Sequence, residues 1–555
     1  MTRQKSTALK NPWLDHQWRR SFSTFFSSRT MVLSLGSALA AVSGAQAQAL
    51  FPAEIDLDTL DGSDGFAING EAASDRSGYS LSGAGDVNGD GIDDLIIGAY
   101  GSDAGGPNAG RSYLVFGSNN GFPNPLELSS LDGSNGFVLD GEAGSHFSGR
   151  GVSDAGDING DGIDDLLIGA PYASPNGPRS GRGYVVFGSD QGLPSAFDLS
   201  TLDGLNGFAL NGETYGDFAG RTLSAAGDVN GDGIDDLIIG ASGTDIDGTN
   251  TGRSYVVFGR DQGFPSNLDL STLDGTNGFA LNGELARTQF GWPVSGAGDV
   301  NHDGFDDLVI GAFFADFNGD ASGRSYVVFG SGDPFATPLE MSTLDGSNGF
   351  VVDGESADDV LGRSLAAVGD VNADGIDDLF IGARGALSQG IRPGRGYVIF
   401  GSTEAFDSAF DLSTLDGSNG FVINGREPFE RSGESVAGGG DINGDGIDDL
   451  MIGATFADAN GANSGRAYVV FGSSDGFPAS IDLAGLDGSS GFAVNGAMEG
   501  DQAGRSVSIV GDVNGDGVDD LLISADRSAA NGSNSGRSYV VFGRAAMFSD
   551  RFEAK

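Results

Sequence analysis

Residues 86–94 read Asp-Val-Asn-Gly-Asp-Gly-Ile-Asp-Asp, and this nine-residue stretch occurs seven times in the chain with few changes. Each copy begins 71 residues after the previous one, at positions 86, 157, 228, 299, 370, 441 and 512. A fixed period of this length is typical of a repeat architecture in which each unit is one supersecondary structure. The sequence therefore predicts seven equivalent structural units.

The repeated stretch has the oxygen side chains of a calcium site. Asp or Asn occupies loop positions 1, 3, 5 and 9, and position 7 offers a backbone carbonyl, which suits Ca²⁺ with its roughly six to eight oxygen ligands. Gly at position 6 permits the sharp turn around the ion. An EF-hand would need Glu at position 12 and a following helix, whereas position 12 is Ile97, inside an apolar run. The loop is expected to lead into a strand.

All seven copies are expected to bind Ca²⁺, because each retains the ligand positions. His302 and Ala373 replace Gly at position 4, where no side-chain ligand is needed. The predicted ligands, with position 7 acting through its carbonyl, are Asp86, Asn88, Asp90, Ile92, Asp94, Asp157, Asn159, Asp161, Ile163, Asp165, Asp228, Asn230, Asp232, Ile234, Asp236, Asp299, Asn301, Asp303, Phe305, Asp307, Asp370, Asn372, Asp374, Ile376, Asp378, Asp441, Asn443, Asp445, Ile447, Asp449, Asp512, Asn514, Asp516, Val518 and Asp520.

The composition fits an exported, metal-loaded protein. The chain has no Cys, so neither disulfides nor thiolate metal sites can stabilise it. Its 78 acidic and 29 basic residues give a formal charge of -49, and the seven loops supply 28 of the acids. This acidity disfavours binding to nucleic acid or to an anionic membrane.

Residues 1–47 differ in kind from the rest. A basic region precedes an apolar stretch at 31–42 and then Ala45-Gln46-Ala47, the order of a secretory signal peptide with a small-x-small cleavage site. Arg19-Arg20-Ser21-Phe22 suggests twin-arginine export, while Met31 as the true initiator is an open alternative. Cleavage would leave a charge of -54, with no later apolar stretch of about 20 residues to span a bilayer. The mature chain is expected to be secreted or to lie at the cell surface.

Each 71-residue unit contains the same four strand signals in order. In the first unit they are residues 80–84, 95–98, 111–117 and 136–141, which we name A, B, C and D. The runs are short, rich in Val, Ile, Tyr and Phe, and bounded by Gly, Asn, Asp and Ser, which is typical of strands. Strand C is apolar on both faces, so its sheet should be covered on both sides.

Seven four-stranded antiparallel sheets packed around an axis make a β-propeller, the all-β fold that we predict for residues 48–545. An open solenoid would need atypical capping repeats, whereas here the last unit stops after strand C, at residues 537–543, and a strand D signal near 65–70 precedes any strand A. This N-terminal strand is expected to complete the seventh blade. Residues 546–555 form a C-terminal tail of unassigned role.

The residues also resemble a known family. The order of Gly-Asp-Val-Asn-Gly-Asp-Gly-Ile-Asp-Asp-Leu, Gly-Ala-Pro at 169–171 and Gly-Arg-x-Tyr-Val-Val-Phe is similar to the FG-GAP repeat of integrin α-subunit propellers, over about residues 51–543. Gly-Ala-Pro corresponds to the GAP part of the family name, and Phe290-Gly291 corresponds to the FG part. The resemblance implies a seven-bladed propeller with calcium between strands A and B. Integrin α-chains carry calcium loops in only some blades, and this sequence lacks their thigh and calf domains and transmembrane helix, so transmembrane signalling is not implied.

A comparison of the seven units separates scaffold from variable positions. One Arg precedes the Tyr of every strand C and is interpreted as structural, pairing within its own blade: Arg111, Arg182, Arg253, Arg324, Arg395, Arg466 and Arg537. The D to A and B to C connections vary, and both emerge on the face opposite the calcium loops because strands alternate in direction. Candidate ligand-binding residues on this loop face are Tyr100, Tyr172, Tyr215, Phe314, Arg384 and Arg392. The alternative is that the sequences of these loops vary because nothing constrains them. For Arg384 and Arg392, another alternative is an ion pair with a neighbouring Asp.

No catalytic residue is predicted. After residue 47 only His146 and His302 remain, neither with a recognisable nucleophile or acidic partner. The sequence favours a calcium-binding adhesion or recognition module that binds an extracellular protein or glycan on its loop face, with oligomeric state open. The alternative is a polysaccharide-processing enzyme, a lyase or hydrolase, on a calcium-stabilised propeller.

Overall fold

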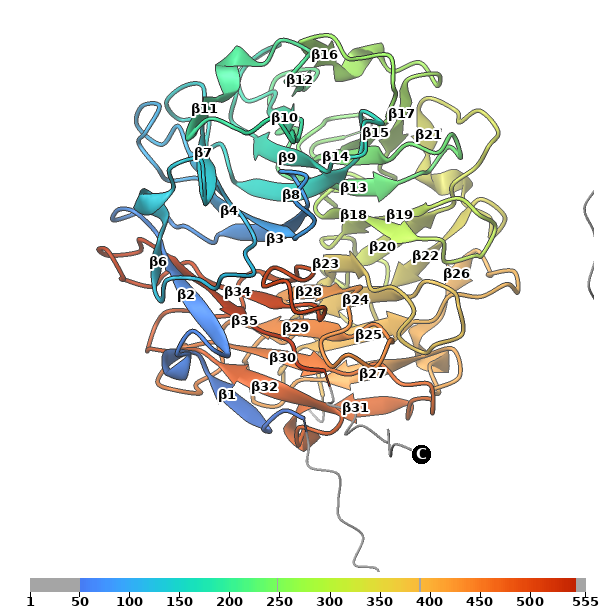
Figure 1. Cartoon of the computed structure of the whole chain (residues 1–555). Coiled ribbons are helices and arrows are strands. Elements are labelled where there is room, and N and C mark those ends of the chain that lie inside the picture. Colours follow the sequence, from blue (N-terminus) through green and yellow to red (C-terminus); the bar gives the residue numbers. More distant parts are fainter. Residues whose placement is uncertain (1–49, 247, 389–390, 546–555) are drawn as a thin grey trace, which may run out of the picture. The chain divides into compact units, whose positions relative to one another are not determined.

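Seven β-sheets form the blades of a propeller in the computed structural model, which describes residues 50–246, 248–388 and 391–545 (Figure 1). The chain divides into two compact units, 1–48 and 49–555, and the propeller belongs to the second. The predicted signal peptide and C-terminal tail lie outside the described residues. The seven-bladed, all-β prediction is confirmed, and among the described residues the only helices are short 3₁₀ turns.

Strands A to D occur in every blade in the predicted order. From blade 1 to blade 7, strand A is β3 (Ser80–Gly85), β8 (Gly151–Gly156), β13 (Thr222–Gly227), β18 (Val294–Gly298), β23 (Leu361–Ala367), β28 (Ser435–Gly438) and β33 (Val507–Ile509). Strand B is β4 (Asp94–Ala99), β9 (Asp165–Ala170), β14 (Asp236–Ala241), β19 (Asp307–Ala312), β24 (Leu379–Ala383), β29 (Leu450–Ala454) and β34 (Leu521–Ala525).

Strands C and D complete the antiparallel part of each sheet. Strand C is β5 (Arg111–Val115), β10 (Arg182–Val186), β15 (Arg253–Val257), β20 (Arg324–Val328), β25 (Arg395–Ile399), β30 (Arg466–Val470) and β35 (Arg537–Val541). Strand D is β7 (Gly136–Asp140), β12 (Gly207–Asn211), β17 (Gly278–Asn282), β22 (Gly349–Asp353), β27 (Gly420–Asn424), β32 (Gly491–Asn495) and, for blade 7, β2 (Gly65–Asn69).

The blades have five strands and not the predicted four. The fifth is short, pairs in parallel with strand D, and comes from the C to D connection of the next unit. From blade 1 to blade 7 it is β11 (Ala196–Asp198), β16 (Asn267–Asp269), β21 (Leu339–Glu340), β26 (Ala409–Phe410), β31 (Ser480–Asp482), β1 (Glu54–Asp56) and β6 (Leu126–Glu127). These segments cover the outer edge of each sheet, which would otherwise present unpaired backbone groups.

A 3₁₀ turn follows each fifth strand. The turns are η1 (Leu57–Thr59), η2 (Leu128–Ser130), η3 (Leu199–Thr201), η4 (Leu270–Thr272), η5 (Met341–Thr343), η6 (Leu412–Thr414) and η7 (Leu483–Gly485). Each buries its first residue, Leu or Met, and polar residues follow it in every turn except η7, where Ala and Gly follow. Asp198 accepts a hydrogen bond from the backbone N–H of Ser200 at 2.9 Å, so the Asp-x-Ser pattern caps this turn.

The N-terminal segment closes the ring at two places. As predicted, β2 pairs with β35 to complete blade 7, with Phe66 opposite Val540. In addition, β1 pairs with β32 and completes blade 6. The N-terminal segment therefore supplies the outermost strand of blade 6 and strand D of blade 7.

The hydrophobic core lies between adjacent blades. One cluster, for example, joins Leu167 and Phe208 of blade 2 to Leu237 and Tyr255 of blade 3. The Tyr of every strand C is fully buried, as Tyr113 is in blade 1, which confirms that both faces of this strand are covered. Strand A is innermost and contacts strand A of its neighbours around the axis. None of the helices in the described part of the chain is long and apolar enough to cross a membrane.

Candidate functional site

The predicted metal loops connect strand A to strand B in all seven blades. In blade 1 the carboxylate of Asp86 accepts hydrogen bonds from the backbone N–H groups of Asp90 at 2.9 Å and Gly91 at 2.7 Å. Asp90 in turn accepts from the N–H of Ile92 at 3.1 Å. The first and fifth positions therefore fold the loop around its own backbone, and the same bonds recur in the other loops.

The ninth position is a carboxylate buried without a cationic partner in the described residues. Asp94 is fully buried and accepts a hydrogen bond from the backbone N–H of Gly117 at 2.9 Å. Burial, with the nearby charges of Asp90 and Asp86, raises the pKa of Asp94 to about 8. The pKa is raised to about 8 in the same way at Asp165, Asp236, Asp307, Asp378, Asp449 and Asp520. A divalent cation beside these groups would favour their ionised form.

The third position tests whether the loops fit a metal ion. In blade 5, Oδ1 of Asn372 is buried and has no hydrogen-bond donor among the described residues, which fits an oxygen that serves as a metal ligand. In blade 1, Nδ2 of Asn88 lies 3.3 Å from Oδ1 of Asp94, so this amide would have to turn its oxygen toward an ion. No group of three or more His, Cys, Asp or Glu side chains in the described part of the chain is gathered as a metal cluster. The donor chemistry fits Ca²⁺, whereas the side chains are arranged to bond to the loop backbone.

The eighth position has a role that the sequence analysis missed. Oδ2 of Asp164 accepts a hydrogen bond from the backbone N–H of Asp86, the first residue of the loop in the preceding blade, at 2.8 Å. The same bond links every pair of neighbouring blades, including Asp93 with Asp512 across the closure. The first Asp of each Asp-Asp pair is therefore a structural link around the ring.

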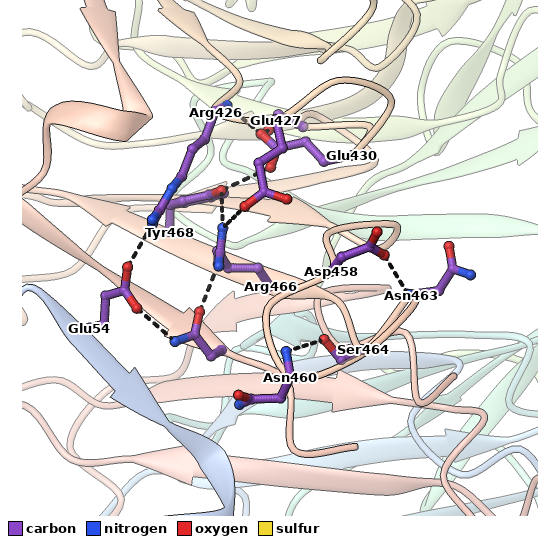
Figure 2. A network of polar contacts seen from close by, with 12 residues as sticks. Glu54, Arg426, Glu427, Glu430, Asp458, Asn460, Asn463, Ser464, Arg466 and Tyr468 are labelled. Carbon is purple, nitrogen blue, oxygen red and sulfur yellow. Dashed lines mark hydrogen bonds and ion pairs between the residues drawn. The ribbon is translucent and has the colours of Figure 1, made fainter. Parts of the chain in front are cut away.

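The Arg of strand C also links neighbouring blades in blades 1 to 6. Arg111 bonds to Asp140 of its own blade at 2.6 Å, as predicted, and to Glu71, in the connection leaving the preceding blade, at 2.8 Å. Figure 2 shows the network in blade 6, where Arg466 lies between Glu427, at 3.0 Å, and the hydroxyl of Tyr468. In the same network Arg426 reaches Glu54 of β1 at 2.8 Å.

The loop face carries a continuous arc of aromatic side chains over blades 1 to 3. Ring centroids are 4.6 Å apart for Tyr79 and Tyr100, 5.9 Å for Tyr100 and Phe147, 5.0 Å for Phe147 and Tyr172, and 5.4 Å for Tyr172 and Phe218. Two predicted face residues, Tyr100 and Tyr172, are thus part of one cluster.

The other predicted face residues lie outside this arc. Tyr215 is 71% exposed, and Phe314 packs on Phe313. Arg384 pairs with the buried Glu434 at 2.7 Å, and Arg392 pairs with Asp358 at 3.1 Å. The two Arg are not an unpaired basic pair, so the structure favours the ion-pair alternative for both.

A second group of residues on this face surrounds the propeller axis, and the sequence analysis did not single it out. One residue from the start of strand A in each blade contributes, and together they line one cavity of about 270 Å³. We name this group the axial ring: Tyr79, Arg150, Arg221, Trp292, Arg363, Glu434 and Arg505. Reading the sequence down this single column of the 71-residue repeat would have shown four Arg in a strongly acidic protein.

The two described His residues lie in different connections, His146 between strands D and A and His302 in a metal loop. Burial lowers the pKa of His146, and its Nδ1 has no hydrogen-bond partner among the described residues. His302 lies in the loop of blade 4 with a positive φ of 57°.

Comparison with known families agrees with the blade structure. A family model described as FG-GAP repeat matches residues 77–115, 152–186, 219–257, 290–328, 361–399, 432–470 and 503–541. Each match runs from strand A through the metal loop to strand C. The chain is an FG-GAP repeat protein. The resemblance predicted from the sequence is thereby confirmed.

Two groups of relatives share these repeats. Human phosphatidylinositol-glycan-specific phospholipase D is 28% identical over 71% of this chain and 46% of its own length, and the bovine protein of that name is 34% identical over 38% and 24%. Chicken integrin alpha-V is 32% identical over 43% of this chain and 20% of its own length. The chain therefore spans less than half the length of these relatives, which include a named enzyme as well as integrin subunits.

Proposed function

We propose that this FG-GAP repeat protein is a calcium-binding recognition module, secreted or at a cell surface, which binds a protein or glycan on its loop face. Calcium would stabilise the opposite face and hold the blades in place. The observation that carries the proposal is the contrast between the two faces. The metal loops are nearly identical in seven blades, while the loop face carries varied aromatic and basic side chains of the kind in which binding energy concentrates.

The carboxylates of the metal loops support the structural role of calcium. The first-position Asp orders its own loop, and the buried ninth-position Asp has no cationic partner among the described residues, so a bound divalent cation would favour its ionised form. The residues that would hold the ion are those at positions 1, 3, 5 and 9, with the carbonyl at position 7. When bound, Ca²⁺ would supply the charge that offsets the burial of the ninth-position carboxylate and would leave the loop face free for a ligand.

The test is a binding experiment with and without calcium. The full chain is applied to an array of glycans and extracellular matrix proteins, and hits are repeated with variants of the aromatic arc, such as Tyr172→Ala, and of the metal face, such as Asp261→Ala. Binding lost in the first variant and kept in the second supports the assignment of faces. The reverse result, in folded protein, contradicts it.

An enzymatic role is a second candidate because several relatives are named phosphatidylinositol-glycan-specific phospholipase D. The aligned regions make up at most 46% of those three proteins, so the name does not transfer to this chain without its own evidence. Turnover of phosphorylated glycolipids or of polysaccharides by the purified full chain is the direct assay. Hydrolysis that scales with protein concentration and persists through purification would favour the enzyme over the recognition module.

A further inference from the structure

The axial ring forms a cup at the centre of the loop face. Its cavity of about 270 Å³ is also lined by the hydroxyl-bearing Ser80, Thr222 and Ser435, one residue further along strand A. Below them lies a belt of aliphatic side chains that are nearly buried: Val152, Leu223, Val294, Leu365, Val436 and Val507. Val436 and Val507 also line a second cavity on the calcium side, so the belt lies between the two. The cup therefore has a charged rim and an apolar floor.

Two Arg side chains of the ring have no carboxylate partner among the described residues. The guanidinium of Arg221 stacks on Trp292 at 3.3 Å from the ring centroid, and its Nε is buried without a hydrogen-bond acceptor. Arg150 donates a hydrogen bond to the hydroxyl of Tyr79 at 3.3 Å and lies over the same ring. In a chain with 78 acidic and 29 basic residues, two partly buried Arg without an acid stand out, because burial of a charge normally requires a partner.

The other two ring Arg share a single acid. Arg363 and Arg505 lie 3.6 Å and 3.3 Å from Glu434, which also pairs with Arg384 at 2.7 Å. The ring thus has four Arg and one Glu. The nearby buried acid Asp526 is already paired with Arg76, at 3.3 Å.

The ionisable groups respond to this excess of positive charge. Burial alone would raise the pKa of Glu434, yet Arg363, Arg384 and Arg505 hold it below its ordinary value. Arg150 and Arg505 likewise hold the pKa of the buried Tyr79 hydroxyl below its usual range. Burial, together with neighbouring Arg, lowers the pKa of Arg221 to about 10. The cup is therefore a region of positive potential in an acidic molecule.

We propose that the axial ring binds a sulfate or phosphate ester group carried by the ligand of the loop face. The four guanidinium groups come from blades 2, 3, 5 and 7, so they approach the cavity from separate directions. This arrangement suits the tetrahedral oxygens of a sulfate or phosphate better than the planar pair of a carboxylate. Arg is well suited to such groups because its planar donors bond to oxyanions directly. The inference rests on the proposed recognition function and names its ligand chemistry.

Binding can be measured on the full chain in millimolar calcium. Galactose 6-sulfate, glucose 6-phosphate and glucuronate are titrated separately by calorimetry. We expect saturable binding of one ester per chain, and at least tenfold weaker binding of glucuronate. Preference for the sulfate or for the phosphate identifies the source of the group. Failure of both esters to bind folded protein, or equal binding of glucuronate, would overturn the proposal.

Variants separate the ring from the general charge of the face. Arg221→Gln should weaken ester binding at least tenfold, and Arg150→Gln serves as the second variant if the first fails to fold. The control Arg179→Gln removes one exposed positive charge from the same face outside the ring and should leave binding unchanged; an equal loss there would contradict a specific site. Glu434→Gln should tighten binding several-fold, because it removes the internal competitor for three Arg.

Trp292 gives an independent signal from the cup. Ester binding should change the fluorescence of the full chain, and Trp292→Phe should abolish that change while calorimetric binding persists. The two proposals can also fail separately. If a loop-face ligand is found that binds Arg221→Gln as tightly as the unmodified chain, the axial ring is not the ester site, while recognition by the loop face still holds.

Discussion

Phe51 stacks on Phe492, with ring centroids 4.4 Å apart and ring planes 11° apart. The same contact joins Phe122 to Phe66 and Phe264 to Phe208, each at the outer edge of a blade. Phe51 therefore occupies a repeated position, although it precedes the first complete unit by sequence. The ring is closed by this contact and by β1 in blade 6, as well as by β2 in blade 7.

Replacement of Phe51 by Ala should loosen the closure. Phe51 is 1% exposed, and removing a buried Phe side chain costs about 3–5 kcal/mol of unfolding free energy. Urea denaturation measures the loss. Phe51→Leu is the matched control, because Leu193 takes this position in blade 1 and packs in the core there; it should cost much less. A Phe51→Ala chain as stable as the unmodified one would show that closure does not depend on this contact.

Strands A to D could be predicted from the sequence because the 71-residue period repeats the same strand signals. Strands A to D are each long enough to show strand composition, and their seven copies reinforce one another. The position of β2 in blade 7 followed from counting strand D signals. The fifth strand was missed because segments such as Ala196–Asp198 are too short to show alternation. Only the exposed edge of the neighbouring sheet makes such a segment a strand.

The sequence predicted the residue types of the candidate site better than it predicted which side chains contact one another. The metal-loop residues are recognisable because ligand type and spacing are local in sequence. The bond from Asp86 to Asp164 of the next blade and the meeting of Arg150 with Tyr79 depend on how blades pack. Arg384 and Arg392 looked unpaired because their acids, Glu434 and Asp358, lie in other connections that only the fold brings near.

Removal of calcium should destabilise the propeller strongly. At a dissociation constant of about 10⁻⁴ to 10⁻³ M, typical of extracellular modules, millimolar calcium would contribute roughly 0.4–1.4 kcal/mol per site. Seven sites would give roughly 3–10 kcal/mol, comparable with the stability of a whole domain. Thermal melting with calcium and with EDTA measures the effect, and coincident melts would contradict the calcium assignment.

A single loop can be tested in the same assay. Asp303→Ala should lower the melting temperature in calcium more than in EDTA, since it removes one predicted ligand of blade 4. The matched control is Asp261→Ala, an exposed Asp outside the loops that removes the same charge; it should change both melts by less than a degree or so.

Ala373, at position 4 of the metal loop in blade 5, adopts a left-handed backbone conformation that is unfavourable for a non-Gly residue. Ala373 has a positive φ of 60°, a conformation that Gly adopts in five of the seven loops. The left-handed conformation costs a non-Gly residue roughly 1 kcal/mol, partly offset by the greater freedom of Gly in the unfolded chain. Ala373→Gly should therefore stabilise the protein by up to about 1 kcal/mol in urea denaturation. Ala405→Gly, at an exposed Ala without a positive φ, should destabilise it slightly, and the same sign for both would contradict the strain argument.

Asp217 should make stability depend on pH between about 4 and 6. Burial raises its pKa from 3.8 to about 6, although the backbone N–H of Thr214 bonds to its carboxylate at 2.7 Å. Glu213 adds to the rise, while Thr244 and Arg253 oppose it. Because the folded state holds this proton more tightly than the unfolded state, the contribution of Asp217 to stability is fully present below pH 3.8 and is lost as pH rises through about 6.

Asp217→Asn should remove this dependence. The amide is uncharged at every pH and can still accept the Thr214 hydrogen bond. In saturating calcium the variant should be more stable than the unmodified chain by about 1 kcal/mol above pH 6, and the difference should vanish near pH 4. Thr288, which holds the equivalent position in blade 4, shows that a neutral side chain is accommodated there. Parallel stability curves over this range would rule out the titration.

Ala497→Glu should complete a network that blade 7 lacks. In blades 1, 4 and 5 the equivalent Glu bonds to both the Arg and the Tyr of strand C, as Glu71 does with Arg111 and Tyr113 at 2.8 and 3.0 Å. In blade 7 that position is Ala497, so Arg537 bonds to Asn69, while the buried hydroxyl of Tyr539 has no partner in the described residues.

A Glu at position 497 would supply an acceptor for both groups. Hydrogen bonds to charged groups contribute about 1.5–3 kcal/mol, and the ordering of a long side chain offsets part of this. We expect a net gain of about 1 kcal/mol in urea denaturation, which should shrink as pH falls below about 4 and the carboxylate is protonated. Ala497→Gln keeps an acceptor without the charge and should gain less. A Glu variant that is less stable than the Gln variant at neutral pH would contradict this prediction. Such a result would indicate that the nearby Asp501 repels the new carboxylate, and that the Glu network of the other blades cannot be built in blade 7.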